Sequence, residues 1–227
     1  MNVLTIDIGG THVKILATGE SERRKFPSGP EMTPRAMVKA VKALAKDWSY
    51  DVISIGYPGP VAAGKPKIDP LHLASGWVGF NFEKAFCCPV KIMNDAALQA
   101  LGSYQGGKML YLGLGTGLGT AMVVGTGEEQ SPVVLPMELG HLPYKSATFE
   151  DYVGTAAIER LGKKKWRKTA LDVIVRLIAG LQPEDTVIGG GNVREISDLP
   201  KGCRAGQNAN AFAGGERLWQ EAQIQIE

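Results

Sequence analysis

The sequence has few cysteines, almost no charge imbalance and no long hydrophobic run. Its 227 residues contain three cysteines, Cys87, Cys88 and Cys203, and two of these are adjacent. No disulfide framework is therefore expected, and free thiols point to a reducing compartment, the cytoplasm. The 25 basic and 23 acidic side chains give a net charge of +2. That balance argues against nucleic acid or an anionic membrane as the main partner.

The sequence also lacks the hydrophobic segments of membrane and exported proteins. No window reaches the roughly 18 uninterrupted apolar residues of a membrane helix. The opening residues MNVLTIDIGG have neither the basic region nor the long apolar region of a signal peptide and are typical of a β-strand. Hydrophobic residues make up 44% and charged residues 21%, which fits a soluble globular protein. The length suits one large domain or two small lobes.

The pattern that is present is an alternation of strands and helices. Strands are predicted over residues 2–8, 12–18, 22–27, 51–60 and 89–95. Helices are predicted over 33–48, where Thr33 is a good N-cap and Pro34 suits the first helical position, and from Ala96 onward. This order indicates an α/β lobe with a mixed sheet.

The opening pattern returns at residue 107, where YLGLGTGLGTAMV resembles TIDIGGTHVKI. The repeat predicts two related lobes, 1–106 and 107–227, although glycine-rich hairpins are common and a chance match is the alternative. The second half is predicted to hold helices over 149–161 and 166–181, a strand over 186–192 that leads into a helix, and a final helix over about 211–227. We expect Gly214 and Gly215 to break the final helix early, and its remainder to pack back on the N-terminal lobe.

Three glycine turns each follow a predicted strand and are candidate phosphate sites: Gly9–Gly10–Thr11, Gly115–Thr116–Gly117 and Gly189–Gly190–Gly191. None fits the Walker pattern or a dinucleotide fingerprint. Glycines let backbone N–H groups approach an anion, and Asp7 would lie where Mg²⁺ can bridge to the phosphate. The alternative for the first turn is an ordinary hairpin whose aspartate bonds the turn amides. Two facing hairpins and a third turn would suit a clamp for phosphoryl transfer.

Polar residues at two further places are candidates for acid–base chemistry and sugar binding. Asn94 and Asp95 end a strand just before a helix, where they can cap the helix, and a carboxylate there can also accept a hydroxyl proton. Glu138, His141 and Glu150 add groups that can bind sugar hydroxyls by paired hydrogen bonds. A lone histidine is more often structural, and no cysteine or histidine at ligand spacing follows His141, so no zinc site is predicted.

In this order the motifs resemble those of the ROK family of sugar kinases, within the actin/hexokinase-like superfamily. The resemblance is carried by DIGGTHVK, GYPGPV, SGWVGFNF, NDAALQALG, LGLGTGLGTAMV, ELGH and VIGGGN, from residue 4 to about 192. It implies an α/β fold of two actin-like (ribonuclease H-like) lobes with a central cleft. It also implies transfer of a phosphoryl group from ATP or polyphosphate to the 6-hydroxyl of a hexose, with Mg²⁺, glucose as the leading acceptor, and a homodimer.

The resemblance also implies roles for single residues, with Asp95 as the catalytic base. The substrate-binding residues would be Pro58, Gly59, Gly76, Asn94, Asp95, Glu138, His141 and Glu150. The residues that bind the phosphoryl donor would be Asp7, Gly9, Gly10, Thr11, Lys14, Gly115, Thr116, Gly117, Gly189 and Gly190, with Asp7 as an indirect Mg²⁺ ligand.

Two departures from the family pattern point to its polyphosphate-glucokinase branch. The segment after ELGH has no cysteine-rich zinc motif, and the stretch from His141 to the last glycine turn is short, which leaves less protein to enclose an adenosine. A polyanionic donor would give a function to the basic run GKKKWRK at 162–168, whose alternative is a solvated helix face. The competing hypothesis is a non-catalytic sugar sensor of the same fold. The presence of Asp95 and a chain that opens on its first strand, with no helix-turn-helix before it, argue against a sensor.

Overall fold

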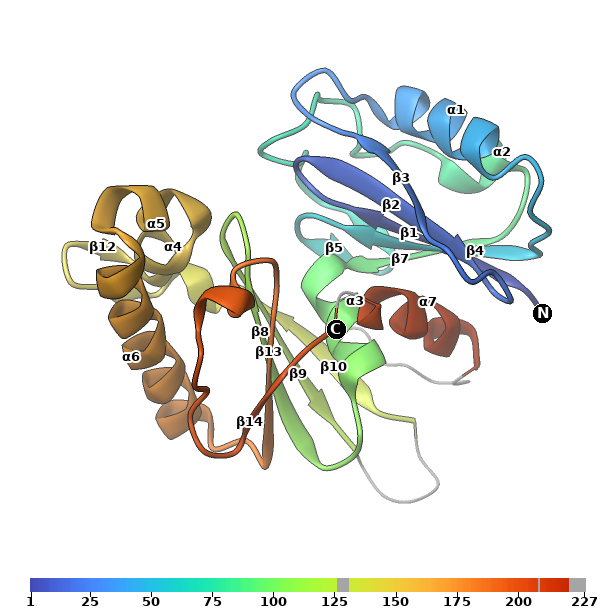
Figure 1. The fold of residues 1–227 in the computed structure, drawn as a ribbon. Coiled ribbons are helices and arrows are strands. Elements are labelled where there is room, and N and C mark those ends of the chain that lie inside the picture. The colour runs from blue at the N-terminus through green and yellow to red at the C-terminus, as the bar shows by residue number, and fades with distance from the viewer. Residues whose placement is uncertain (126–130, 208, 221–227) are drawn as a thin grey trace.

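The computed structural model describes residues 1–125, 131–207 and 209–220, which fold into two five-stranded sheets (Figure 1). Residues 221–227 of the predicted final helix lie outside the described residues. Within the part described, no helix is long and apolar enough to cross a membrane.

The first sheet has the order β3-β2-β1-β4-β7. Its strands are β1 (Val3–Ile8), β2 (His12–Ala17), β3 (Arg24–Pro27), β4 (Val52–Tyr57) and β7 (Val90–Asn94). The first three form an antiparallel meander, and β4 and β7 continue the sheet in parallel. Two helices, α1 (Pro34–Leu44) and α2 (Phe82–Phe86), cover one face (Figure 1). Helix α1 begins as predicted, because Thr33 accepts a hydrogen bond from the Ala36 N–H at 3.2 Å.

The second sheet repeats this order as β10-β9-β8-β13-β14. Its strands are β8 (Lys108–Leu114), β9 (Leu118–Val124), β10 (Val133–Met137), β13 (Asp185–Gly189) and β14 (Cys203–Ala205). Again three antiparallel strands come first and two parallel strands follow. The two sheets therefore form the two related lobes that the repeated motif predicts, in an α/β fold of the actin-like type.

Helices α4 (Phe149–Val153), α5 (Thr155–Leu161) and α6 (Lys163–Leu181) cover one face of the second sheet (Figure 1). The single helix predicted over 149–161 is wrong, because the extended backbone of Gly154 divides it. The helix predicted after residues 186–192 is also wrong: only the 3₁₀ turn η2 (Val193–Glu195) follows, since a run of three glycines disfavours helix.

Short elements complete the fold. They are the hairpin β5 (Val61–Ala62) with β6 (Lys65–Pro66), the 3₁₀ turn η1 (Leu139–His141), and the hairpin β11 (Pro143–Tyr144) with β12 (Ala147–Thr148). The first hairpin leads into the loop of the SGWVGFNF motif.

Helices α3 (Asp95–Ser103) and α7 (Asn210–Gln220) lie side by side between the two sheets (Figure 1). Helix α3 follows the last strand of the first sheet yet packs on β8 and β9 of the second. Helix α7 follows the last strand of the second sheet and packs on β1 and β4 of the first. Each lobe thus receives a helix from the other half of the chain.

Helix α7 runs unbroken through Gly214 and Gly215, so the predicted break is wrong. The two glycines permit close packing instead. A Cβ on Gly214 would lie 1.9 Å from the Leu98 carbonyl oxygen, and a Cβ on Gly215 would lie 2.0 Å from Thr5 Oγ1. The Ser54 hydroxyl donates to the Gly215 carbonyl at 2.7 Å, which ties the helix to β4.

Candidate active site

The site is built around the first residues of α3, where β7 ends. Asn94 caps the helix, because its Oδ1 accepts the Ala97 N–H at 3.0 Å. Its Nδ2 also donates to the carbonyl of Gly59 at 3.3 Å, so one side chain fixes both the helix and the Pro58–Gly59 loop. The Asp95 Oδ1 accepts the Ala96 N–H at 2.8 Å. Asn94 therefore has the capping role that the sequence allowed, and it presents Asp95 at the helix N-terminus.

Asp95 has a strongly raised pKa. Burial is the main cause, and the carboxylates of Asp7 and Glu138 add to it, so the pKa of Asp95 rises to about 7. The backbone N–H of Ala96 opposes this shift without cancelling it. A carboxyl with a pKa near 7 is matched to proton transfer at neutral pH. The two carboxylates that raise the pKa come from different lobes, Asp7 from the first and Glu138 from the second.

The first glycine turn joins β1 to β2, and a partly buried ion pair lies beside it. Lys14 Nζ is 3.0 Å from Asp7 Oδ2, and these residues are paired across β1 and β2. The turn itself is closed by the Gly9 N–H, which donates to the His12 carbonyl at 3.0 Å. The Ser28 hydroxyl donates to the Gly9 carbonyl at 2.5 Å. Hydrogen bonds at both the N–H and the carbonyl of Gly9 thus fix the backbone of the first glycine turn.

The second and third glycine turns adjoin each other in the second lobe. The Gly115 carbonyl accepts hydrogen bonds from the Thr155 N–H at 3.0 Å and from Asn192 Nδ2 at 3.0 Å. Asn192 follows the third turn, in which Gly190 has φ +83°. A Cβ on Gly190 would lie 2.2 Å from the Leu114 carbonyl oxygen, so only glycine fits there.

The residues predicted to bind sugar in the second lobe gather around η1. Glu138 and His141 flank this turn, and Glu150 of α4 accepts the Leu118 N–H at 3.1 Å. Burial and the neighbouring Glu150 raise the pKa of Glu138, while His141 opposes the rise. These residues therefore lie on or next to two adjoining elements, η1 and α4.

Gly76 lies on the first lobe, in a loop that sequence analysis did not explain. Asp69 closes this loop by accepting the N–H groups of Gly76 at 3.1 Å, Trp77 at 2.8 Å and Val78 at 3.1 Å. These bonds lower the pKa of Asp69. The sequence pattern does not indicate this role of Asp69. Its carboxylate accepts N–H groups that lie seven to nine residues further along the chain, and this spacing matches neither helix nor strand periodicity. The sequence pattern does not indicate His72 of the same loop either.

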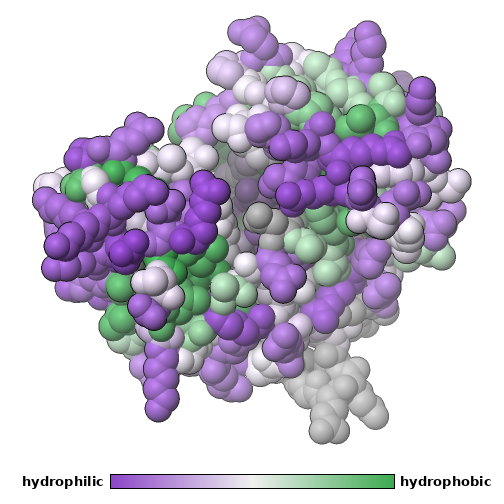
Figure 2. Space-filling model, in the orientation of Figure 1, coloured by the Kyte–Doolittle hydropathy of each residue, from purple (hydrophilic) through white to green (hydrophobic). Residues whose placement is uncertain are grey.

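The structure thus joins the second and third glycine turns and places Gly59 against Asn94, and the charges of Asp7 and Glu138 act on Asp95. Within the described residues, no hydrogen bond links the first glycine turn to the other two. They belong to opposite lobes, and Figure 2 shows the molecular surface hollowed between the lobes.

The carboxylates of the site fit a magnesium ion better than a zinc ion. Among the described residues, no three His, Cys, Asp or Glu side chains cluster as a metal-binding group. Magnesium needs less protein than that: one or two carboxylates are sufficient when substrate phosphates and water supply the other oxygens. Asp7 offers such an oxygen beside the first glycine turn, since Lys14 pairs with Oδ2.

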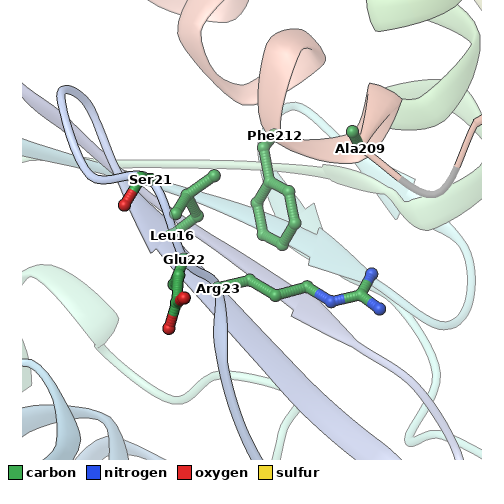
Figure 3. Close-up of a pocket in the computed structure, with 6 residues that line it drawn as sticks. All are labelled: Leu16, Ser21, Glu22, Arg23, Ala209 and Phe212. Atoms are coloured by element: carbon green, nitrogen blue, oxygen red, sulfur yellow. The ribbon is translucent and has the colours of Figure 1, made fainter.

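A separate pocket of about 420 Å³ lies between the β2–β3 turn and the start of α7 (Figure 3). Its lining consists of Leu16, Ser21, Glu22, Arg23, Ala209 and Phe212. None of the predicted site residues is among them, so this pocket is not part of the candidate site.

The repeated five-stranded sheets and the polar residues between them define an actin-like two-lobed α/β protein. The model of the ROK family matches residues 3–157, and the chain belongs to the ROK family. A search of curated protein sequences gave no match.

Solved structures show the same fold. An inorganic polyphosphate/ATP-glucomannokinase from Arthrobacter sp. strain KM has a TM-score of 0.78 at 22% identity, over 94% of this chain and 96% of that one. A ROK family glucokinase from Streptomyces griseus, in complex with glucose and AMPPNP, has a TM-score of 0.75 at 17% identity, over 98% and 100%. A ROK hexokinase from Thermus thermophilus has a TM-score of 0.67 at 18% identity, over 94% and 96%.

Proposed function

We propose that the protein is a cytoplasmic hexose kinase that transfers a phosphoryl group to the 6-hydroxyl of glucose. Family membership supports phosphotransfer, and one observation carries the assignment of the base. Asp95 begins α3 between the two lobes, and burial together with the charges of Asp7 and Glu138 raises its pKa to about 7. A base of this strength accepts a hydroxyl proton at neutral pH and releases it again after turnover.

In the proposed reaction Asp95 accepts the proton of the sugar hydroxyl as that oxygen bonds to the terminal phosphorus of the donor. The bond between this phosphorus and the donor's bridging oxygen breaks, and the electron pair leaves with the shortened donor. Asn94, Glu138, His141 and Glu150 orient the sugar, together with the Gly59 and Gly76 loops. The three glycine turns bind donor phosphates. Bound Mg²⁺, held by Asp7, would neutralise phosphate charge.

We propose inorganic polyphosphate as a donor, with ATP as the alternative. The support is the position of the basic run at the start of α6. Lys163 Nζ lies 2.9 Å from Glu195 Oε2, and Arg167 Nε donates to the Glu195 carbonyl at 2.6 Å. Glu195 belongs to η2, which directly follows the third glycine turn. The basic run therefore adjoins the proposed donor site.

The test is the phosphorylation of glucose with Mg²⁺ and either ATP or long-chain polyphosphate, in separate reactions. Asp95→Asn is expected to lower kcat by about 10²–10⁴-fold, because it removes the proton acceptor. Glucose affinity, measured by calorimetry, should stay near that of the parent. Full activity in Asp95→Asn would refute the assignment of the base. Glucose binding by the parent without turnover on either donor would favour the sugar sensor.

We also propose that two chains form a homodimer, as the resemblance to the family implies. Sedimentation equilibrium of the purified chain distinguishes a dimer from a monomer.

A further inference from the structure

We propose that His72 binds the phosphoryl donor: its imidazole donates a hydrogen bond to a phosphate oxygen held at the Gly9–Gly10–Thr11 turn. The inference rests on the proposed kinase function and adds to its donor site a residue from the loop on the sugar side. His72 would then link the two substrate sites of the first lobe.

The position of His72 is fixed by the loop that carries it, between β6 and α2. Asp69 closes this loop through three backbone N–H groups. The Ala74 N–H donates to the Met32 carbonyl at 3.2 Å, and Leu73 is buried next to His72. Such anchoring on both sides holds the backbone of His72 in place while the side chain stays exposed to solvent.

The imidazole lies directly against the first glycine turn. A Cβ built on Gly10 would be 3.5 Å from His72 Cβ and 3.7 Å from Cδ2. These are ordinary contact distances, so the His72 side chain lies close to Gly10 on the side where a Cβ would project. A phosphate bound to this turn would come within reach of a ring nitrogen.

The imidazole of His72 is also available to bind a ligand. Across the residues that the structure describes, its ring makes no hydrogen bond. The other histidine at the turn differs, since His12 Nδ1 lies 3.3 Å from Thr11 Oγ1. A neutral imidazole has one N–H to donate and an imidazolium has two.

The negative charge of the carboxylates around the site favours an additional hydrogen-bond donor for a bound phosphate. The charges of Asp7 and Glu138 both act on Asp95, and Lys14 is paired with Asp7 at 3.0 Å. A phosphate chain adds further negative charge to this region, so additional hydrogen-bond donors are needed to hold it. His72 supplies one at the first glycine turn.

The experiment compares tripolyphosphate binding by the parent with that of three variants, using calorimetry on the full chain. His72→Ala should weaken tripolyphosphate binding by about tenfold or more, because a hydrogen bond to a charged group is lost. Its glucose affinity should change by less than about twofold. His72→Gln, which keeps an N–H donor, should restore most of the binding. Leu71→Ala is the matched control, because Leu71 is 89% exposed on the same loop.

Unchanged tripolyphosphate binding in His72→Ala would overturn the inference, as would an equal loss in Leu71→Ala. Turnover measured in parallel separates this outcome from failure of the proposed function. If the parent phosphorylates glucose while His72→Ala keeps the parental KM for the donor, the inference alone fails. If the parent binds tripolyphosphate through His72 yet phosphorylates no hexose, the inference stands and the kinase proposal fails. A parent that binds no tripolyphosphate refutes the inference, and turnover of glucose with ATP then decides the kinase proposal separately.

Discussion

At the scale of single residues, the proposed role of Asp95 as a base depends on the environment of this side chain more than on its identity. An exposed aspartate is fully ionised at neutral pH and is a weak base. Burial, together with Asp7 and Glu138, brings the pKa of Asp95 to about 7. The two neighbouring carboxylates come from different lobes, so the basicity of Asp95 depends on how the lobes are arranged.

The raised pKa predicts a specific pH dependence. Only the ionised Asp95 can accept a proton, so kcat/KM should rise as the pH increases through about 7 and level off above it. Below this pKa the rate should fall about tenfold per pH unit. The measurement is the initial rate of glucose phosphorylation between about pH 5.5 and 8.5, and Asp95→Asn is the control that should lose the transition. A parent rate that is independent of pH across this range would contradict the role of Asp95 as the base.

The NDAALQALG motif predicts Asp95 as a candidate base because strand, polar pair and helix are contiguous there. No comparable motif marks Asp69 or His72. Asp69 acts on backbone N–H groups further along its own loop, and His72 contacts Gly10 from a distant part of the chain. Contacts of this kind arise only when the loop closes, so neither composition nor periodicity reveals them.

At the scale of elements, glycine has opposite effects in two helices. In α7, Gly214 allows α3 to approach so closely that a Cβ would lie 1.9 Å from the Leu98 carbonyl oxygen. In α6, Gly180 has no atom within 4 Å of the equivalent position. The same residue type is therefore required for packing in one helix and merely tolerated in the other.

This contrast gives a matched pair of substitutions. Gly214→Ala should lower the free energy of unfolding by about 1–3 kcal/mol, because overpacking against a backbone oxygen outweighs the better helix propensity of alanine. Gly180→Ala should raise the free energy of unfolding by about 0.5–1 kcal/mol. Urea titrations of both variants check these values. A stabilised Gly214→Ala variant would show that α3 and α7 can separate without cost.

The predicted break in α7 was wrong because close packing of its glycines outweighs their low helix propensity. Helix propensity describes an isolated segment, in which paired glycines are unfavourable. In the folded chain, a hydrogen bond from Ser54 and close contact with α3 stabilise the helix through these residues. By contrast, the predicted start of α1 held, since capping by Thr33 and a proline at the first position are local effects.

At the scale of the whole molecule, the charged side chains are unevenly distributed although the net charge is small. The chain carries only +2 overall. Lys164, Lys165 and Lys168 nevertheless lie exposed on the first turns of α6, and within the described part of the chain they form no ion pair. Lys163 differs because Glu195 neutralises it. These three lysines are the ones that a polyanion could use.

Replacing Lys164, Lys165 and Lys168 with glutamine should raise the KM for long polyphosphate by about tenfold at low salt and leave the KM for ATP nearly unchanged. Removing three positive charges weakens attraction for a long polyanion, and added salt should reduce the effect by screening. Lys39, Lys42 and Lys46 lie exposed on and just after α1 and provide a triple glutamine control with the same charge change. Equal KM values for polyphosphate in both triple variants would contradict a role for the basic run.

The repeated motif predicted the two lobes correctly because each copy begins with the same local hairpin. The exchange of α3 and α7 between lobes could not be predicted in this way. A helix shows its apolar face in the sequence but not which sheet it will cover.

That exchange has a consequence for how the protein is made. A chain emerges from the ribosome N-terminus first, and domains tend to fold as they appear. The strands of the first sheet can pair early, but the face of β1 and β4 that α7 covers stays open until residues 210–220 have been synthesised. During that interval the hydroxyls of Thr5 and Ser54, which donate to carbonyls of α7 in the folded protein, are without these partners. The first lobe to be translated is therefore among the last parts of the molecule to become complete.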